Sequence, residues 1–164
     1  MSEQGAGTRK ATFAAGCFWG VEAAFRNVDG VKSTRVGYTG GHVQNPTYEQ
    51  VCTNTTGHAE AVEIEFDPSR VTYEQLLTVF WENHDPTQLD RQGPDVGSQY
   101  RSAIFTHDDA QREAAERSKQ EEDASGRHRK PTVTQIVSQA PFYEAEDYHQ
   151  QYLEKRGLAS CRIG

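Results

Sequence analysis

A cysteine between two glycines has the clearest chemical potential of any residue in this chain. The run Gly16-Cys17-Phe18-Trp19-Gly20 lies where a strand-like segment gives way to apolar residues at helical spacing. A thiol at the start of a helix faces backbone N–H groups and the positive end of the helix dipole, which favour thiolate. Phe18 and Trp19 can wall an apolar pocket beside the sulfur. The alternative is a buried cysteine with a purely structural role in the core, but this residue order favours a reactive thiol.

Glu60 is the best candidate for an acid that would serve this thiol. In the alternating segment His58–Phe66 it shares a face with Val62 and Ile64, the predicted core face. A carboxyl group on an apolar face has a raised pKa and can stay protonated near neutral pH. It could then donate a proton to a substrate oxygen. A glutamate at a strand end that simply reaches water is the alternative, and the parity argues against it.

Three further residues are candidates: Tyr48 and Asp95 in the two predicted long loops, and Tyr100 at the start of the strand predicted after the second loop. Tyr48 and Tyr100 each offer a neutral O–H donor, although a packed tyrosine with a satisfied hydroxyl is the commoner arrangement. Asp95 follows Gly93-Pro94 and could equally serve only to form a turn.

His58 and His84 are conceivable bases for Cys17, although their positions in the sequence do not establish proximity. The other histidines have the character of surface residues: His42, His107, His128 and His149. There is no Cys-x-x-Cys, and no helix carries a histidine pair at helical spacing, so we expect no metal site.

Cys161 is the candidate partner of Cys17 in a redox cycle. It lies close to the end of the chain, where a mobile tail could bring it to a distant thiol. A stray cysteine in the tail is the alternative. Cys52, in a predicted loop-to-strand region, is interpreted as structural. With three widely spaced cysteines a disulfide scaffold is not expected, and we predict a cytoplasmic protein with reduced resting thiols.

Strands interleaved with helices indicate an α/β or α+β sandwich. We predict long loops over 40–57 and 85–97. The predicted strands are Lys10–Ala15, Val31–Tyr38, His58–Phe66, Gln99–Thr106 and Pro131–Val137. One predicted helix begins at Phe18, and three others cover Val71–His84, Asp108–Ser125 and Glu144–Arg156.

Length and charge narrow the possible partners. The chain has 164 residues, enough for one domain with a substantial core, and a net charge of −7. The basic run Arg127-His128-Arg129-Lys130 is interpreted as a solvated loop, so nucleic acid and membranes are poor candidate partners. No apolar run is long enough for a membrane span, and no signal peptide is predicted.

Several further motifs complete a pattern in which the chain resembles the peptide methionine sulfoxide reductases of type A. The resemblance extends from about Thr12 to the last predicted helix. The motifs are Gly16–Gly20, Gly37–Gly41, Asn45–Tyr48, Gly57–Val62, His84–Thr87, Asp90–Gly93, Gly97–Ser102 and Tyr143–Tyr152.

The resemblance implies an α+β fold, a two-layer sandwich with a ferredoxin-like core and long functional loops. It also implies that Cys17 attacks the sulfoxide sulfur while Glu60 protonates the oxygen. Tyr48 and Tyr100 would donate hydrogen bonds to that oxygen, Phe18 and Trp19 would hold the methyl group, and Asp95 would orient the substrate or organise the site. Thioredoxin is the implied reductant, and no cofactor is implied.

The tail departs from the family pattern, in which many members carry a longer glycine-rich tail with one or two recycling cysteines. Here Cys161 is the only candidate, in a different local sequence. We expect residues 1–8 to be a disordered N-terminal segment, 9–157 to be one catalytic domain and 158–164 to be the tail. We expect a monomer that acts on free and protein-bound methionine sulfoxide.

Two other functions remain open at this point. A cysteine hydrolase would use Cys17 as nucleophile with His58 or His84 as base, and would have no need of Cys161. A non-catalytic module could grip thioether side chains without chemistry.

Overall fold

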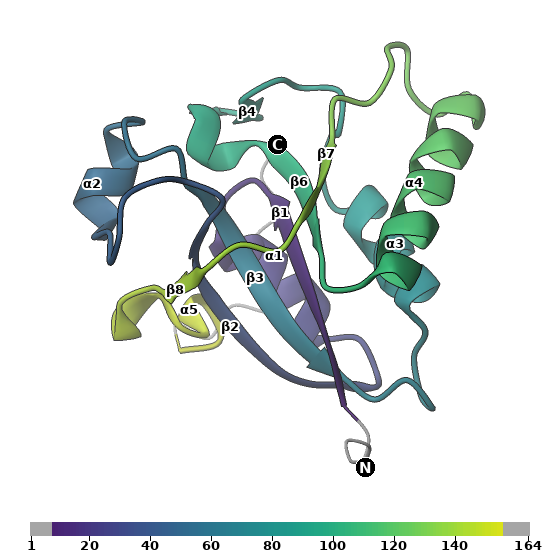
Figure 1. The fold of residues 1–164 in the computed structure, drawn as a ribbon, viewed down its shortest axis with the longest axis horizontal. Coiled ribbons are helices and arrows are strands. Elements are labelled where there is room, and N and C mark those ends of the chain that lie inside the picture. The colour runs from purple at the N-terminus through teal and green to yellow at the C-terminus, as the bar shows by residue number, and fades with distance from the viewer. Residues whose placement is uncertain (1–7, 156–164) are drawn as a thin grey trace.

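A computed structural model describes residues 8–155 as an α+β fold built around a curled mixed sheet (Figure 1). The strands are β1 (Arg9–Ala15), β2 (Val31–Thr39), β3 (Ala59–Phe66), β4 (Arg91–Gln92), β5 (Asp95–Val96), β6 (Ser102–Thr106), β7 (Gln135–Ser138) and β8 (Phe142–Glu144). The helices are α1 (Phe18–Arg26), α2 (Tyr48–Cys52), α3 (Tyr73–Glu82), α4 (Asp109–Ala124) and α5 (Tyr152–Lys155), with 3-10 turns η1 (Ser98–Tyr100) and η2 (Asp147–His149). None of the described helices is long and apolar enough to cross a bilayer.

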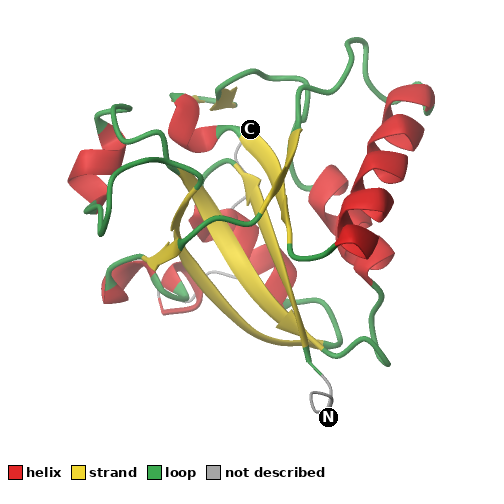
Figure 2. Cartoon of the chain, viewed as in Figure 1, coloured by secondary structure: helices red, strands yellow, loops and turns green. Residues whose placement is uncertain are grey.

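The main sheet has the strand order β7-β6-β1-β3-β2-β8, and only the β6–β7 pair is parallel. Its two edge strands follow one another in the chain, with three residues between Ser138 and Phe142. Four Cα steps span at most about 14 Å, whereas six strands side by side in a flat sheet would separate their edges by about 24 Å. The sheet must therefore curl, and its strong twist is visible in Figure 2.

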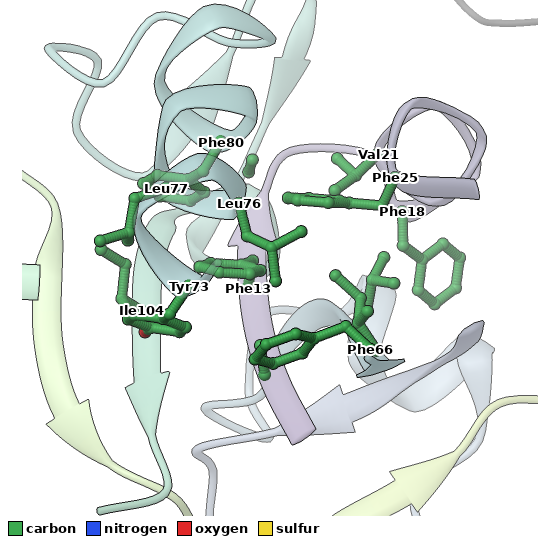
Figure 3. Close-up of a cluster of buried hydrophobic side chains, with 14 of the residues drawn as sticks. Phe13, Phe18, Val21, Phe25, Phe66, Tyr73, Leu76, Leu77, Phe80 and Ile104 are labelled. Carbon is green, nitrogen blue, oxygen red and sulfur yellow. The ribbon is translucent and has the colours of Figure 1, made fainter. Parts of the chain in front are cut away.

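The main core lies between one face of the sheet and helices α1 and α3 (Figure 3). Phe13 of β1 occupies its centre, fully buried, with its ring centroid 5.0 Å from that of Phe25 and 5.3 Å from that of Phe80. Helix α3 begins at a complete capping box, because Thr72 and Gln75 each bind the other's backbone N–H through their side chains. Helix α4 packs on α3 and on β6–β7.

The parity predicted for β3 is confirmed for its core face, since Glu60, Val62 and Ile64 are all buried there. The opposite face is also covered in part. Ala59 and Ala61 pack with Phe105 in a second apolar cluster, against which Phe142 lies. This cover arises because the sheet curls and its last strand returns beside β2.

Several predicted boundaries are wrong. The loop predicted over 40–57 contains α2, and the loop predicted over 85–97 contains the β4–β5 hairpin. The strand predicted from Gln99 begins only at Ser102, after η1, and the strand predicted from Pro131 begins only at Gln135. The helix predicted from Glu144 is replaced by η2 and the short α5, because Glu144 still belongs to β8 and pairs with Gly37 of β2.

Truncating Phe13 tests the central role of this side chain. Phe13→Ala should lower the free energy of unfolding by about 3–5 kcal/mol, since it leaves a cavity between three other aromatic rings. Urea unfolding monitored by circular dichroism measures the change. Val137→Ala on the edge strand β7, where the side chain is 42% exposed, is the control and should change stability by about 0.5 kcal/mol or less. Equal effects of the two substitutions would contradict this description of the core.

Candidate active site

Cys17 occupies the junction between β1 and α1, as the N-cap residue of the helix. It is half-buried, and its carbonyl accepts the first bond of the helix from Val21 N at 3.4 Å. Gly16 has a φ of 102°, and a Cβ there would lie 2.9 Å from the side chain of Gln92. Only glycine fits this turn without strain. Cys17 thus lies at the N-terminus of the helix, where the dipole favours thiolate.

Glu60 is bound directly to the start of the same helix. Its Oε1 accepts a hydrogen bond from Phe18 N at 3.2 Å, and its Oε2 accepts one from Gln99 Nε2 at 3.1 Å. The side chain is buried, as the strand parity predicts. The carboxyl group therefore satisfies one of the N–H groups that a helix leaves unpaired at its first turn. The donor, Phe18, directly follows Cys17 in the chain, so the carboxyl group is bound next to the cysteine.

Opposing effects set the proton affinity of Glu60. Burial raises its pKa from 4.5 to about 7, and the negative charge of Asp95 acts in the same direction. The hydrogen bonds from Gln99 and Phe18 lower it, because they stabilise the carboxylate. The result is a group with substantial protonated and ionised populations near neutral pH, which suits a proton donor that must be recharged in every cycle.

The two predicted phenols lie near this carboxyl group. Burial raises the pKa of Tyr48 far above its ordinary value, and the Cys52 thiol and the charge of Glu60 contribute further. Burial also raises the pKa of Tyr100, with contributions from the charges of Glu60, Asp95, Cys52 and Cys17. Both side chains are therefore protonated hydrogen-bond donors at neutral pH. Tyr48 begins α2 and Tyr100 ends η1, so two loops bring them together.

Asp95 lies in β5, at the edge of the site. It is half-buried, and burial raises its pKa. Its charge influences Glu60 and Tyr100, as the shifts of those two groups indicate. Its position in a short hairpin agrees with the turn predicted for this segment.

Two aromatic residues follow Cys17, and they occupy different environments. Phe18 is almost fully buried, with its ring 5.8 Å from Tyr38. Trp19 is half-buried and stacks on Tyr152 of α5, with 3.7 Å between ring centroids. Its indole N–H donates to Nδ1 of His149 at 2.9 Å.

The prediction that His149 is a surface residue is wrong, because the side chain is completely buried. Its ring lies against those of Phe18, Trp19 and Tyr48, at 5.2, 5.6 and 4.5 Å between centroids. The error arises because η2 replaces the predicted helix and turns this residue inward. The bond from Trp19 requires an unprotonated Nδ1, and burial lowers the pKa of the imidazole, consistent with a neutral ring.

Glu146 and Gln99 are further residues of this region that the sequence analysis did not single out as site residues. Glu146 accepts hydrogen bonds from the hydroxyl of Tyr38 at 2.8 Å and from the backbone N–H of Tyr48 at 2.9 Å. Gln99 points its amide at both Glu60 and Cys52 Sγ, which is 3.6 Å away. The sequence did point to both residues, because Gln99 lies in the motif Gly97–Ser102 and Glu146 in the motif Tyr143–Tyr152. Neither motif, however, shows which groups these side chains contact.

The histidines proposed as bases have other roles. His58 accepts a hydrogen bond from Gly41 N at Nδ1, 3.0 Å away, and its Nε2 lies 2.7 Å from the carbonyl of Val43. His84 contacts the Phe80 carbonyl through Nδ1 and Ser102 Oγ through Nε2. Burial lowers the pKa of His84 to about 4. With both ring nitrogens engaged, neither histidine is placed to accept a proton from Cys17, which removes the basis of the hydrolase hypothesis.

Cys52 ends helix α2 instead of lying in a loop-to-strand region, and its side chain is exposed. Cys161 lies outside the described residues. Within residues 8–155, no three His, Cys, Asp or Glu side chains are arranged to hold a metal ion.

Comparison with known proteins identifies the family. A family model described as "Peptide methionine sulfoxide reductase" matches residues 9–164. The chain belongs to the peptide methionine sulfoxide reductase family. A "Peptide methionine sulfoxide reductase MsrA" of Methanothermobacter thermautotrophicus is 65% identical over 154 residues, which cover 94% of this chain and 91% of the relative. The activity is therefore that of a type A reductase, an oxidoreductase acting on the S epimer of methionine sulfoxide.

Solved structures share the fold of this reductase family. Mxr1 from Saccharomyces cerevisiae in reduced form superimposes with a TM-score of 0.86 at 32% identity, covering 99% of this chain and 96% of Mxr1. Mxr1 in complex with Trx2 superimposes with a TM-score of 0.63 at 24% identity, covering 99% and 92% of the two chains. The second comparison concerns the fold alone. The α+β class predicted from the sequence is confirmed, with a six-stranded curled sheet.

The raised pKa of Glu60 predicts a pH-dependent difference in stability from a Glu60→Gln variant. Folding favours the protonated carboxyl, so this contribution is fully present below about pH 4.5 and is lost as the pH rises through about 7. Between these limits the parent should lose roughly 3 kcal/mol relative to the variant. Urea unfolding of both proteins at pH steps from 4.5 to 8 measures the difference. Parallel stability curves would show that Glu60 titrates near its ordinary pKa.

Proposed function

We propose that Cys17 is the nucleophile and Glu60 the proton donor in the reduction of methionine S-sulfoxide. The observation that carries this proposal is the hydrogen bond from Phe18 N to Glu60 Oε1, which holds a partly protonated carboxyl group beside the N-cap thiol. Sulfoxide oxygen is a poor leaving group until it is protonated. The phenols of Tyr48 and Tyr100, both protonated donors near Glu60, stabilise the charge that develops on that oxygen.

The reduction step transfers one oxygen atom and two electrons. The Cys17 thiolate attacks the sulfoxide sulfur, Glu60 delivers a proton to the oxygen, and the oxygen ends on the Cys17 sulfur. Methionine leaves as the thioether, and Cys17 becomes a sulfenic acid. The sulfoxide sulfur is reduced by two electrons, and the cysteine sulfur is oxidised by two.

Phe18 and Trp19 form the pocket for the substrate methyl group in this proposal. The stacking of Trp19 on Tyr152 and its hydrogen bond to His149 support this role, because they fix one wall of the pocket. Asp95 organises the site from its edge through its charge effect on Glu60 and Tyr100.

A second thiol completes the cycle. We infer that Cys161 condenses with the Cys17 sulfenic acid, which releases water and forms a disulfide, and that thioredoxin then reduces this disulfide. The complex of Mxr1 with Trx2 supports the choice of reductant. We propose a cytoplasmic setting, in which thiols are kept reduced between turnovers. The substrates are free methionine sulfoxide and oxidised proteins.

The domain assignment and the finer fold assignment are also proposals. We propose that 9–157 form one monomeric catalytic domain with a ferredoxin-like core, and that 158–164 form the tail that carries Cys161. The strand order β6-β1-β3-β2, with α1 and α3 on one face, supports the ferredoxin-like assignment.

Removing the carboxyl acid tests the role of Glu60. Glu60→Gln should slow sulfenic acid formation on Cys17 by about 10²- to 10⁴-fold at neutral pH, the usual worth of a positioned general acid, with a smaller change in KM. Rapid quenching with dimedone after mixing with pure S-sulfoxide measures the step in one turnover. Glu63→Gln, three residues further along β3, is the matched control. An unchanged rate in Glu60→Gln would move the acid role to another residue, and an unlabelled Cys17 would refute the nucleophile assignment.

Removing the proposed second thiol separates the two halves of the cycle. Cys161→Ser should form about one methionine per enzyme and then stop with thioredoxin as reductant, because the sulfenic acid has no partner thiol. Cys52→Ser is the sharper control, since Cys52 lies beside Gln99 in the site and is the alternative partner. The amount of methionine formed per enzyme over several turnovers distinguishes the two variants. Loss of cycling in Cys52→Ser instead of Cys161→Ser would reverse the assignment.

A further inference from the structure

A groove with a volume of about 1060 Å³ opens beside Cys17. Cys17 and Asp95 line one part of it, and neither Glu60 nor the two phenols is among its described lining residues. The groove continues along the segment that contains Asp85, Leu89 and Arg91 and reaches the connection between α4 and β7. That connection lies at the same end of the molecule as β4 (Figure 1). The groove is thus a continuation of the active site.

The groove is less acidic than the protein as a whole. Four basic side chains line it, against three acidic ones, and one of the basic residues, Arg127, is paired with the buried Glu122, so the groove is about neutral with histidines neutral, whereas the chain carries −7. Three of the basic residues belong to one connection, the basic rim, which we define as residues 127–130. The acidic residues are Glu82, Asp85 and Asp95, and the fourth basic residue is Arg91.

The basic rim has more cationic groups than partners. Arg127 and His128 both bind the carboxylate of Glu122, a buried residue of α4, with 2.6 Å from His128 Nε2 to Oε2. Arg129 and Lys130 are exposed, and within residues 8–155 neither forms a hydrogen bond or an ion pair. Their charges are therefore available to a bound molecule.

The acidic groups of the groove do not neutralise these two cations. Burial raises the pKa of Asp85, but the hydrogen bonds that it accepts from Thr87 N and Thr87 Oγ1 oppose burial, and the pKa is lowered overall, so Asp85 is ionised. Asp95 lies at the Cys17 end of the groove. Glu82 is exposed at the end of α3 and forms no ion pair among the described residues. In the described part of the chain, none of the three carboxylates forms an ion pair with Arg129 or Lys130, so the unpaired positive charge of the groove includes that of the basic rim.

We propose that this groove binds the polypeptide that flanks a methionine sulfoxide and favours an acidic side chain in it, which Arg129 and Lys130 attract. The inference rests on the proposed function, because it assumes that the sulfoxide is held at Cys17. Leu89, which is 68% exposed at the groove, offers an apolar contact to the same polypeptide. Free methionine sulfoxide has no flanking polypeptide, so this preference applies only to peptides and proteins.

Kinetics with three S-sulfoxide substrates test the proposal, with dithiothreitol as the reductant. The first is N-acetylmethionine sulfoxide amide, and the second is a neutral peptide that contains methionine sulfoxide. The third is a series of the same peptide with a pair of glutamates, placed at increasing distances from the sulfoxide on its N-terminal or its C-terminal side. For at least one position of the pair, kcat/KM should exceed that of the neutral peptide by about threefold to tenfold at low salt, as expected for two exposed charge pairs. The advantage should fall as ionic strength rises, because exposed charges are screened.

A double charge reversal, Arg129→Glu with Lys130→Glu, should abolish this advantage and leave the blocked amino acid unaffected. The matched control is Arg9→Glu with Lys32→Glu, the same charge change near the start of β1 and β2, at the far end of the sheet from Cys17. That control should keep the advantage.

Three outcomes would overturn the inference. The first is equal kcat/KM for neutral and acidic peptides in an enzyme that reduces the blocked amino acid. The second is an advantage that survives the rim reversal. The third is a rim reversal that leaves the peptide kinetics with dithiothreitol unchanged but raises the KM for thioredoxin in a parallel assay with that reductant, which would assign the groove to the reductant. Failure to reduce any of the three substrates would instead refute the proposed function.

Discussion

The hydrogen bond between the backbone N–H of Phe18 and the carboxyl group of Glu60 is the interaction on which the site depends. It joins the first turn of α1 to the second residue of β3, and these segments are 42 residues apart in the chain. Cys17 has no freedom to leave this junction, because Gly16 turns the chain in a conformation that other residues avoid. A bond that caps a helix therefore also fixes the distance between the thiol and the acid.

The same bond lowers the pKa of Glu60, and the surrounding structure raises it again. Hydrogen bonds from Phe18 and Gln99 stabilise the carboxylate, and alone they would leave Glu60 ionised at neutral pH. Burial on the apolar face of β3 and the charge of Asp95 act against them. The pKa of about 7 of the proposed proton donor thus arises from a balance between a position in the core and the polar partners that any buried carboxyl group requires.

The sequence predicts the parts of the site that local pattern controls, and it fails where contacts between distant segments decide. Strand parity alone places Glu60 on the core face, and the glycine-flanked Cys17 is found at its predicted strand-to-helix junction. The inward turn of His149 was missed, because it depends on β8 pairing with β2 and ending the predicted helix early. The bridging amide of Gln99 follows from loop geometry, which residue periodicity does not encode.

The curl of the sheet accounts for the remaining wall of the site. Next to β8 the edge of β2 is bound by the side chain of Gln150. Its Oε1 accepts from Val36 N and its Nε2 donates to Val36 O, both at 2.9 Å. The carbonyl of Val36 also accepts from Ala145 N at 2.9 Å, so the buried amide adds to the backbone pairing of this edge. Because Gln150 directly follows His149, this anchor helps to hold the imidazole against Trp19, which we propose as one wall of the methyl pocket.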